Sequence, residues 1–181
     1  MHSEDREIIT LIQFEGTRRT GFERIVKLYH EQVYWLIRRL VVDHDDADDL
    51  TQETFIKVWK NLSGFRGESS LFTWIYRIAT NEALVFLRKR RIRAAFRLGS
   101  VVNDLSLSLK NDAFYRAEEA QDRFQKAILV LPDKQRLVFH LKYFDVMTFE
   151  QISEITGTST GALKASYHHA VKKIQNKLSE V

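Results

Sequence analysis

The sequence has no cysteine, one proline (Pro132) and only seven glycines among its 181 residues. The lack of cysteine excludes disulfides, thiolate metal sites and cysteine nucleophiles, and it suits a reducing compartment. So few turn-forming residues argue against a sandwich or barrel and favour a mostly helical protein. No uncharged apolar run approaches the ~20 residues that cross a bilayer, and the N-terminus lacks a signal-peptide core. We therefore expect a cytoplasmic, helical protein without membrane insertion.

Charge is segregated along the chain, although the net charge is only +4. Residues 43–53 contain six acids and no Lys or Arg, whereas residues 88–97 contain six bases and no acid. Between Glu154 and Glu180 the only charged residues are four lysines. The two basic surfaces suggest a polyanionic partner, and the acidic surface suggests a basic partner. Solvated helix faces produce similar runs of like charge.

Apolar residues recur at helical spacing in residues 22–41, 50–62 and 71–86, and again in residues 124–144. This periodicity predicts amphipathic helices with one buried face each. Between the two groups the periodicity weakens, and Gly99-Ser100 introduces an irregular stretch. We therefore predict an all-α protein of two helical domains, residues 10–95 and 121–181, joined by an irregular linker, residues 96–120.

The last part of the chain has the pattern of a helix-turn-helix. Thr148 and Gln151 form a capping-box signature, Gly157 follows where a turn needs positive φ, and Ser159 can cap the next helix. In that second helix the apolar residues share one side, and small, polar and basic residues occupy the other. This combination favours DNA binding over a purely structural helix pair.

No constellation of catalytic or metal-binding residues is found in the sequence. His168 and His169 are adjacent, and neighbouring residues on a helix point about 100° apart rather than toward one ion. Gly-rich phosphate loops and nucleophile-elbow motifs are missing as well. We expect no catalytic residue, no metal and no cofactor.

The helix after the acidic run carries a mixed stripe. Asp49, Gln52, Glu53 and Ile56 occupy positions i, i+3, i+4 and i+7 of one face. An acidic helix N-terminus would stabilise the macrodipole, but that does not explain an exposed isoleucine among polar residues. A docking face for a basic partner helix does explain it.

A second stripe follows on the next helix, inside a segment rich in aromatic residues. Trp74, Arg77, Asn81 and Arg88 are spaced by three, four and seven residues. An aromatic ring, an amide and two guanidinium groups in line suit single-stranded nucleic acid, where bases stack and phosphates pair with arginine. Of the other aromatic residues nearby, we expect Phe55, Trp59 and Phe72 to lie in the core.

The chain resembles a bacterial RNA polymerase sigma factor of the extracytoplasmic-function group over almost its whole length. Residues 48–55 (DDLTQETF) look like the core-polymerase-binding segment of that family. Residues 65–69 (FRGES) and 73–81 (TWIYRIATN) look like its −10 melting segment, and residues 131–136 (LPDKQR) and 161–164 (GALK) like landmarks of its −35-binding domain. One departure is Ser166, where many members carry a basic residue.

The resemblance implies a sigma-2-like bundle, a sigma-4-like helix-turn-helix domain and a role for each stripe. Core RNA polymerase would contact the first stripe, Asp49, Gln52, Glu53 and Ile56. The single-stranded −10 element would contact Phe65, Arg66, Trp74, Arg77, Ile78, Asn81 and Arg88, with Phe65, Ile78 and Asn81 forming a pocket for one flipped base. The double-stranded −35 element would contact Ser159, Thr160, Gly161, Lys164, Ala165, His168, Lys172 and Lys173.

The implied function is promoter recognition and strand opening by a non-enzyme, with an anti-sigma factor as a further partner that the resemblance allows. A first alternative is a free-standing helix-turn-helix regulator with an N-terminal sensor domain, which would bind an operator tightly without polymerase and leaves the acidic docking face unexplained. A second alternative is a helical enzyme, which the lack of a catalytic site disfavours.

Overall fold

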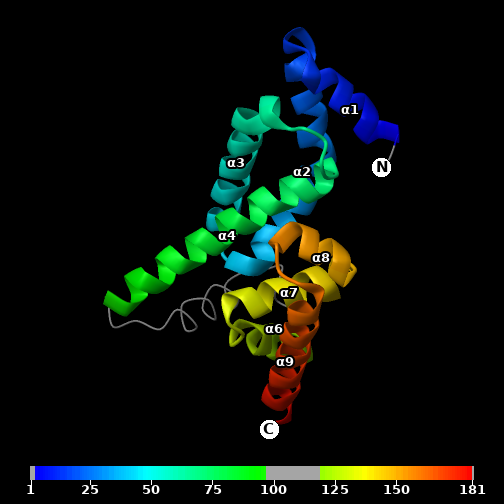
Figure 1. Cartoon of the computed structure of the whole chain (residues 1–181). Coiled ribbons are helices and arrows are strands. Elements are labelled where there is room, and N and C mark those ends of the chain that lie inside the picture. Colours follow the sequence, from blue (N-terminus) through cyan, green and yellow to red (C-terminus); the bar gives the residue numbers. More distant parts are fainter. Residues whose placement is uncertain (1–2, 97–118, 181) are drawn as a thin grey trace.

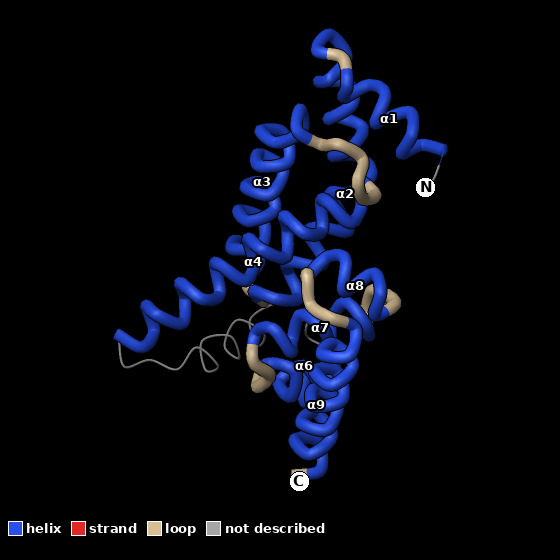
Figure 2. The backbone as a smooth tube through the Cα atoms, viewed as in Figure 1, coloured by secondary structure: helices blue, strands red, loops and turns tan. Residues whose placement is uncertain are grey.

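A computed structural model of the chain describes residues 3–96 and 119–180 (Figure 1). Its helices are α1 (Ser3–Gln13), α2 (Arg18–Val41), α3 (His44–Asn61), α4 (Leu71–Phe96), α6 (Glu119–Leu129), α7 (Asp133–Tyr143), α8 (Phe149–Thr156) and α9 (Thr160–Ser179), with short 3₁₀ turns at Glu15–Thr17 and Leu62–Gly64. Within each of these two ranges short loops join the helices, and neither range contains a strand (Figure 2). The all-α prediction is confirmed; the predicted linker lies almost entirely outside the described residues.

The first helical unit consists of α2, α3 and α4, with α1 packed across α2. The domain predicted from the sequence starts at residue 10, inside α1. Ile8 and Ile12 of α1 are buried, so this helix is part of the packed unit. A Cβ at Gly21 would lie 2.6 Å from the Cγ2 of Ile12, so the glycine allows α1 to approach α2 closely. The Tyr29 hydroxyl also donates to the Asp5 carboxylate at 2.8 Å.

Side-chain caps fix where α3 and α4 begin. The Asp43 carboxylate accepts hydrogen bonds from the backbone N–H groups of Asp45 and Asp46, which begins α3 at the acidic segment. The Ser70 hydroxyl accepts from the Thr73 N–H at 3.0 Å at the start of α4. These caps therefore fix the starting points of α3 and α4, the two helices that carry the candidate polymerase and −10 stripes.

The second unit consists of α6 to α9, and its helix-turn-helix is formed by α8 and α9. The capping box of Thr148 and Gln151 is present, Gly157 has φ 67°, and the Ser159 hydroxyl accepts from Ala162 N. Each of these features confirms the sequence prediction. A core between α6, α7 and α9 contains Ala127, Ile128, Leu131, Phe139, Ala170 and Ile174.

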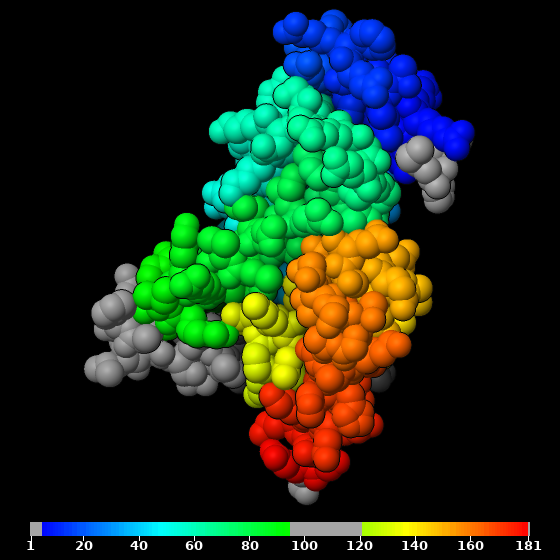
Figure 3. Space-filling view, viewed as in Figure 1, coloured from blue at the N-terminus to red at the C-terminus, as the bar shows by residue number. Residues whose placement is uncertain are grey.

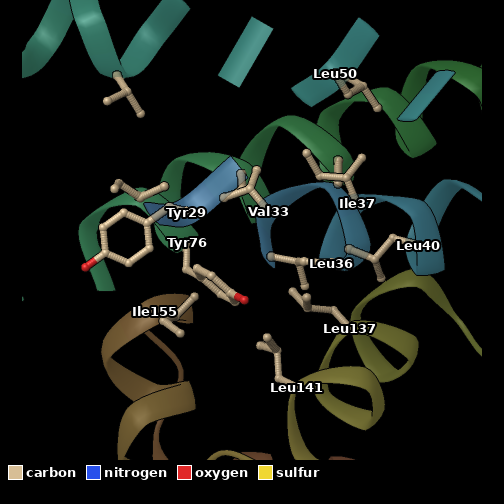
Figure 4. Close-up of a cluster of buried hydrophobic side chains, with 14 of the residues drawn as sticks. Tyr29, Val33, Leu36, Ile37, Leu40, Leu50, Tyr76, Leu137, Leu141 and Ile155 are labelled. Atoms are coloured by element: carbon tan, nitrogen blue, oxygen red, sulfur yellow. The ribbon is translucent and has the colours of Figure 1, made fainter. Parts of the chain in front are cut away.

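The two units also share one continuous hydrophobic core, which the sequence did not predict. Leu137 and Leu141 of α7 and Ile155 of α8 lie among Leu36 of α2 and Tyr76 of α4 (Figure 4). In the space-filling view the α8–α9 segment, in orange, lies directly against the green atoms of the first unit (Figure 3). In this structure the units therefore form one packed body.

Charged groups surround this shared core. Arg39 of α2 pairs with Asp145, in the loop between α7 and α8, at 2.8 Å, and Arg91 of α4 pairs with Asp133 of α7 at 2.7 Å. Burial raises the pKa of the Asp145 carboxyl, while Arg39 partly opposes that shift. His140 is buried completely, so desolvation and then the nearby Arg136 guanidinium hold its pKa well below the ordinary value.

Candidate polymerase and nucleic-acid interface

The acidic stripe lies on the solvent side of α3. Asp49, Gln52 and Glu53 are exposed, and Ile56 is 52% exposed. The opposite side of the helix is buried through Leu50, Phe55 and Val58 among others. The predicted face therefore exists as a continuous exposed surface.

An apolar groove of about 710 Å³ between α2 and α3 extends this surface. Phe22 and Val26 of α2 and Ile56 and Trp59 of α3 line it. The prediction that Trp59 lies in the core is wrong, because its side chain is 42% exposed and its ring only packs edge-on against Phe22, with centroids 5.1 Å apart. Its position three residues after Ile56 was the signal that could have placed it on the docking face.

A cavity of about 530 Å³ lies between the loop after α3 and the start of α4. Phe65, Arg66, Trp74 and Arg77 line it, and the rings of Phe65 and Trp74 lie 5.1 Å apart. Gly67 takes a φ of 72°, which turns the loop back toward α4. Phe65 is half-buried rather than enclosed in the core, so the cavity offers an aromatic wall beside two guanidinium groups.

Asn81 lies in a different place from Phe65. It lines a cavity of about 340 Å³ between the two units, together with Leu137 of α7, Thr156 of α8 and Leu163 of α9. Phe65 and Asn81 thus line different cavities in this arrangement, and α8 packs against α4. Arg88 is exposed farther along α4, which extends away from the packed units in Figure 1.

Arg77 contacts α8 directly. Its Nη2 donates to the backbone carbonyl of Glu154 at 2.6 Å. One turn earlier in α4, the Thr73 hydroxyl lies 3.5 Å from the Glu154 carboxylate. Part of the candidate −10 surface is therefore in contact with the helix-turn-helix of the same chain.

The candidate −35 surface on α9 is open to solvent. Exposed residues there are Ser159, Gly161, Lys164, Ala165, His168, Lys172 and Lys173, while Thr160 is half-buried. Leu163, Ala170 and Ile174 on the other side are buried, as the sequence predicted. The Lys173 ammonium donates to the Gln135 side chain at 3.0 Å, which links α9 to α7. Ser166 instead lines the cavity between the units.

Within the described parts of the chain, no group of three or more His, Asp or Glu side chains is placed to hold a metal ion. The rings of His168 and His169 lie 6.0 Å apart with their planes at 63°. Among the same residues, no helix has both the length and the apolar character needed to span a membrane.

Family models match both units: Sigma-70 region 2 matches residues 25–93, and Sigma-70, region 4 matches residues 121–174. The chain is 30% identical to the ECF RNA polymerase sigma factor SigW of Bacillus subtilis over 170 residues, covering 89% of this chain and 90% of SigW. It is 29% identical to the ECF RNA polymerase sigma-E factor of Escherichia coli, covering 96% of this chain and 94% of that protein.

Among solved structures, the chain is similar to the sigma factor RpoE of Bartonella quintana, solved in complex with the anti-sigma factor NepR. The TM-score is 0.64 at 25% identity, and the match covers 88% of this chain and 97% of RpoE. The sequence motifs, the two helical units and these similarities agree. The chain belongs to the extracytoplasmic-function group of the sigma-70 family and is a transcription initiation sigma factor.

Proposed function

We propose that this chain recruits core RNA polymerase through α3, reads the −35 element with α9 and holds the opened −10 strand against α4. The observation that carries this proposal is the combination of three separate surfaces on one chain. The surface on α3 is acidic and apolar, and the surface at the start of α4 combines aromatic rings with arginines. The surface on α9 carries small, polar and basic side chains. A single-site regulator needs only the last of these.

The polymerase-binding surface consists of Asp49, Gln52, Glu53 and Ile56, extended by Trp59. Gln52 and Ile56 line the apolar groove, whereas Asp49 and Glu53 line a separate cavity between α3 and α4. Carboxylates on the same helix as an apolar groove suit a partner helix with basic flanks, because charge steers the encounter and apolar burial supplies affinity. Ile56 and Trp59 are half exposed, which is costly for a face that serves only as solvent surface.

The −35 surface consists of Lys164, Ala165 and His168, with Ser159, Thr160 and Gly161 at the helix start. A helix of this kind enters the major groove with its N-terminal residues at base edges. Lys172 and Lys173 lie farther along α9, where we assign them to backbone phosphates. The small side chains of Gly161 and Ala165 allow close approach to the DNA.

The −10 surface consists of the cavity beside Phe65 and the outward stripe of α4. An extruded base can stack on Phe65 or Trp74, and Arg66 and Arg77 can neutralise the flanking phosphates. Ile78 and Asn81 continue this surface along α4, where the Asn81 amide can both donate to and accept from a base edge. Arg88 extends the basic part of the helix.

We further propose that the protein acts without a catalytic step or a cofactor, in the cytoplasm, as a partner of polymerase and promoter DNA. An anti-sigma factor is a candidate partner because RpoE, to which the chain is similar, was solved bound to one. The competing function is a free-standing helix-turn-helix regulator. The exposed acidic stripe of α3 favours the polymerase partner, because the regulator leaves this stripe unexplained.

Transcription in vitro with purified core polymerase over a library of genomic promoters tests this function. We expect transcripts that require the chain, and we expect their start sites to lie downstream of two shared sequence elements. Binding of the chain to duplex DNA without any polymerase-dependent transcript would instead support the regulator.

A further inference from the structure

A row of basic side chains on α9 includes one residue whose charge depends on pH. Lys164, His168 and Lys172 follow one another at intervals of four residues, so they share one face of the helix, and all three are exposed. Since an α-helix rises about 1.5 Å per residue, the row is about 12 Å long, with His168 at its centre. Lysine is charged throughout the neutral range, whereas an imidazole ordinarily loses its proton near about pH 6.5.

His169, the next residue, lies on a different side of α9. Neighbouring residues on a helix point about 100° apart, and the two imidazole rings lie 6.0 Å apart with their planes at 63°. Ser166, three residues before His169, lines the cavity between the units. Lys173, four residues after it, donates to Gln135 of α7. His169 is exposed as well, but it belongs to the edge of α9 nearer α7, whereas His168 lies in the middle of the lysine row.

Within the described residues, no carboxylate forms an ion pair with His168. The acidic groups on α6, α7, α8 and the loop between α7 and α8 are Asp122, Asp133, Asp145, Glu150 and Glu154. The first three pair with Lys126, Arg91 and Arg39, respectively, and the two glutamates of α8 are exposed. The basic group on the side of α7 is Lys142, which lies with Lys164 against the Phe149 ring. A charge on His168 therefore has no anionic partner until a polyanion binds.

Duplex DNA supplies that partner. It carries about one negative charge per 1.7 Å of helix axis, so a row of about 12 Å spans several phosphates. An opposite charge within about 4–6 Å favours the charged form of a titratable group. A protonated imidazole also donates through both ring nitrogens, so it can hold a phosphate oxygen or the acceptor edge of a guanine. Binding of the duplex therefore favours uptake of a proton by the ring at the centre of the row.

We propose that His168 takes up one proton when α9 binds duplex DNA, so that the −35 contact of this chain tightens as the pH falls from 8 to 6. The proposal rests on the proposed function in assigning α9 to the −35 duplex, and it adds a regulation of that surface. One proton bound only in the complex changes the affinity by at most about tenfold per pH unit. Promoter binding by this chain thus follows the pH of its surroundings.

The affinity of the full chain for a fluorescent DNA duplex of mixed sequence, measured at pH 8 and at pH 6, tests the proposal. His168→Gln keeps a polar side chain that cannot gain a charge. Between the two pH values we expect the wild type to gain at least about fivefold in affinity relative to this variant, within the limit for one proton. His168→Lys is charged at both pH values and should bind tightly at both. His169→Gln is the matched control and should keep the wild-type pH dependence.

The salt dependence of binding gives a second readout on the wild-type chain. Each further cation at the interface steepens the plot of log affinity against log salt concentration by about 0.9 for B-form DNA. The wild-type slope should therefore be steeper at pH 6 than at pH 8 by nearly this amount. The slope of His168→Lys should be steep at both pH values, and that of His168→Gln should be shallow at both.

The outcomes that overturn the proposal differ from those that overturn the proposed function. A pH dependence that is the same in the wild type and in His168→Gln overturns the proposal, as does an equal wild-type salt slope at the two pH values. The assignment of α9 to DNA survives either result when Lys172→Ala weakens duplex binding at both pH values. If Lys172→Ala and His168→Lys both leave the affinity unchanged, α9 is not the duplex-binding surface and the proposed function fails together with the proposal.

Discussion

The two proposed DNA surfaces differ in how much the rest of the chain covers them. On α9, Lys164 and His168 face solvent, whereas on α4 Arg77 is held by α8 and Asn81 lines a cavity between the units. Both surfaces carry the residue types that nucleic acid requires. In this conformation the proposed −35 surface is open to solvent, whereas part of the proposed −10 surface is in contact with α8.

The third surface, on α3, is open like that of α9. Its stripe lies on the opposite side of α3 from the helix's buried face, away from the shared core. The proposed polymerase surface is therefore accessible in the packed arrangement.

The largest effect should come from reversing charge on the open α3 surface. Asp49→Lys with Glu53→Lys brings like charges against a basic partner and should cost several kcal/mol of binding free energy. Co-purification with core polymerase measures it. Glu31→Lys, an exposed reversal on α2, is the control. Undiminished co-purification of a folded double variant would remove α3 as the docking surface.

The covered −10 surface should matter only after polymerase has bound. Phe65→Ala and Asn81→Ala should leave polymerase affinity unchanged and reduce open complex, because stacking on an aromatic ring is worth ~1–3 kcal/mol per base. Permanganate-reactive thymines in the bubble report the loss, with Ser63→Ala in the same loop as control. Full reactivity in both variants would assign strand opening to other residues.

On the open −35 surface, single substitutions should act without any change of conformation. Lys164→Ala should relax base preference at one position by ~1–3 kcal/mol if it contacts a base edge. Lys172→Ala should lower affinity for all sequences alike and reduce the salt slope by about one, as expected for a phosphate contact. Footprinting separates the two patterns. Equal −35 protection by a variant lacking residues 148–181 would contradict the assignment.

The smallest expected effect is the contribution of His140, beside the shared core, to the pH dependence of the free energy of unfolding. Its pKa is lowered by burial and by Arg136 and Arg39, so the packed state favours the neutral ring. The unfolded chain takes up a proton near pH 6.5, and the free energy of unfolding should therefore fall as pH drops below about 6.5. Above that pH the contribution of His140 is fully present.

Asp145 opposes this trend at lower pH. Because the pKa of Asp145 is raised, the packed state takes up a proton at a higher pH than the unfolded chain does. Acidification toward pH 4 therefore increases the contribution of Asp145 to the free energy of unfolding. Chemical unfolding of wild type and His140→Leu across pH 7.5 to 5 isolates the histidine, because Asp145 is common to both. A pH dependence that is identical in the two proteins would show that His140 does not titrate as proposed.

Local features of this fold could be read from the sequence because short-range chemistry fixes them. Thr148 with Gln151, the positive φ of Gly157 and the Ser159 cap all depend on residues within one turn. The stripe of Asp49 and Ile56 follows from helical spacing alone. These elements carry the proposed polymerase and −35 surfaces, so the exposure of both stripes could be predicted.

Features that depend on tertiary packing were not predictable in the same way. Trp59 was expected in the core because large aromatic side chains usually are, but the groove beside α2 leaves it half exposed. The contact of Arg77 with Glu154 joins residues 77 positions apart in the chain, and no local pattern encodes it.

The separation between α4 and α9 in the transcribing complex tests the account most directly. In the free chain labelled through Ser63→Cys and Asn176→Cys we expect a short separation. Adding core polymerase and an active promoter should extend it toward the ~85 Å that separates the two DNA elements. A short separation that persists in a complex making transcripts would contradict the claim that the −10 surface is covered in the free protein and exposed by opening.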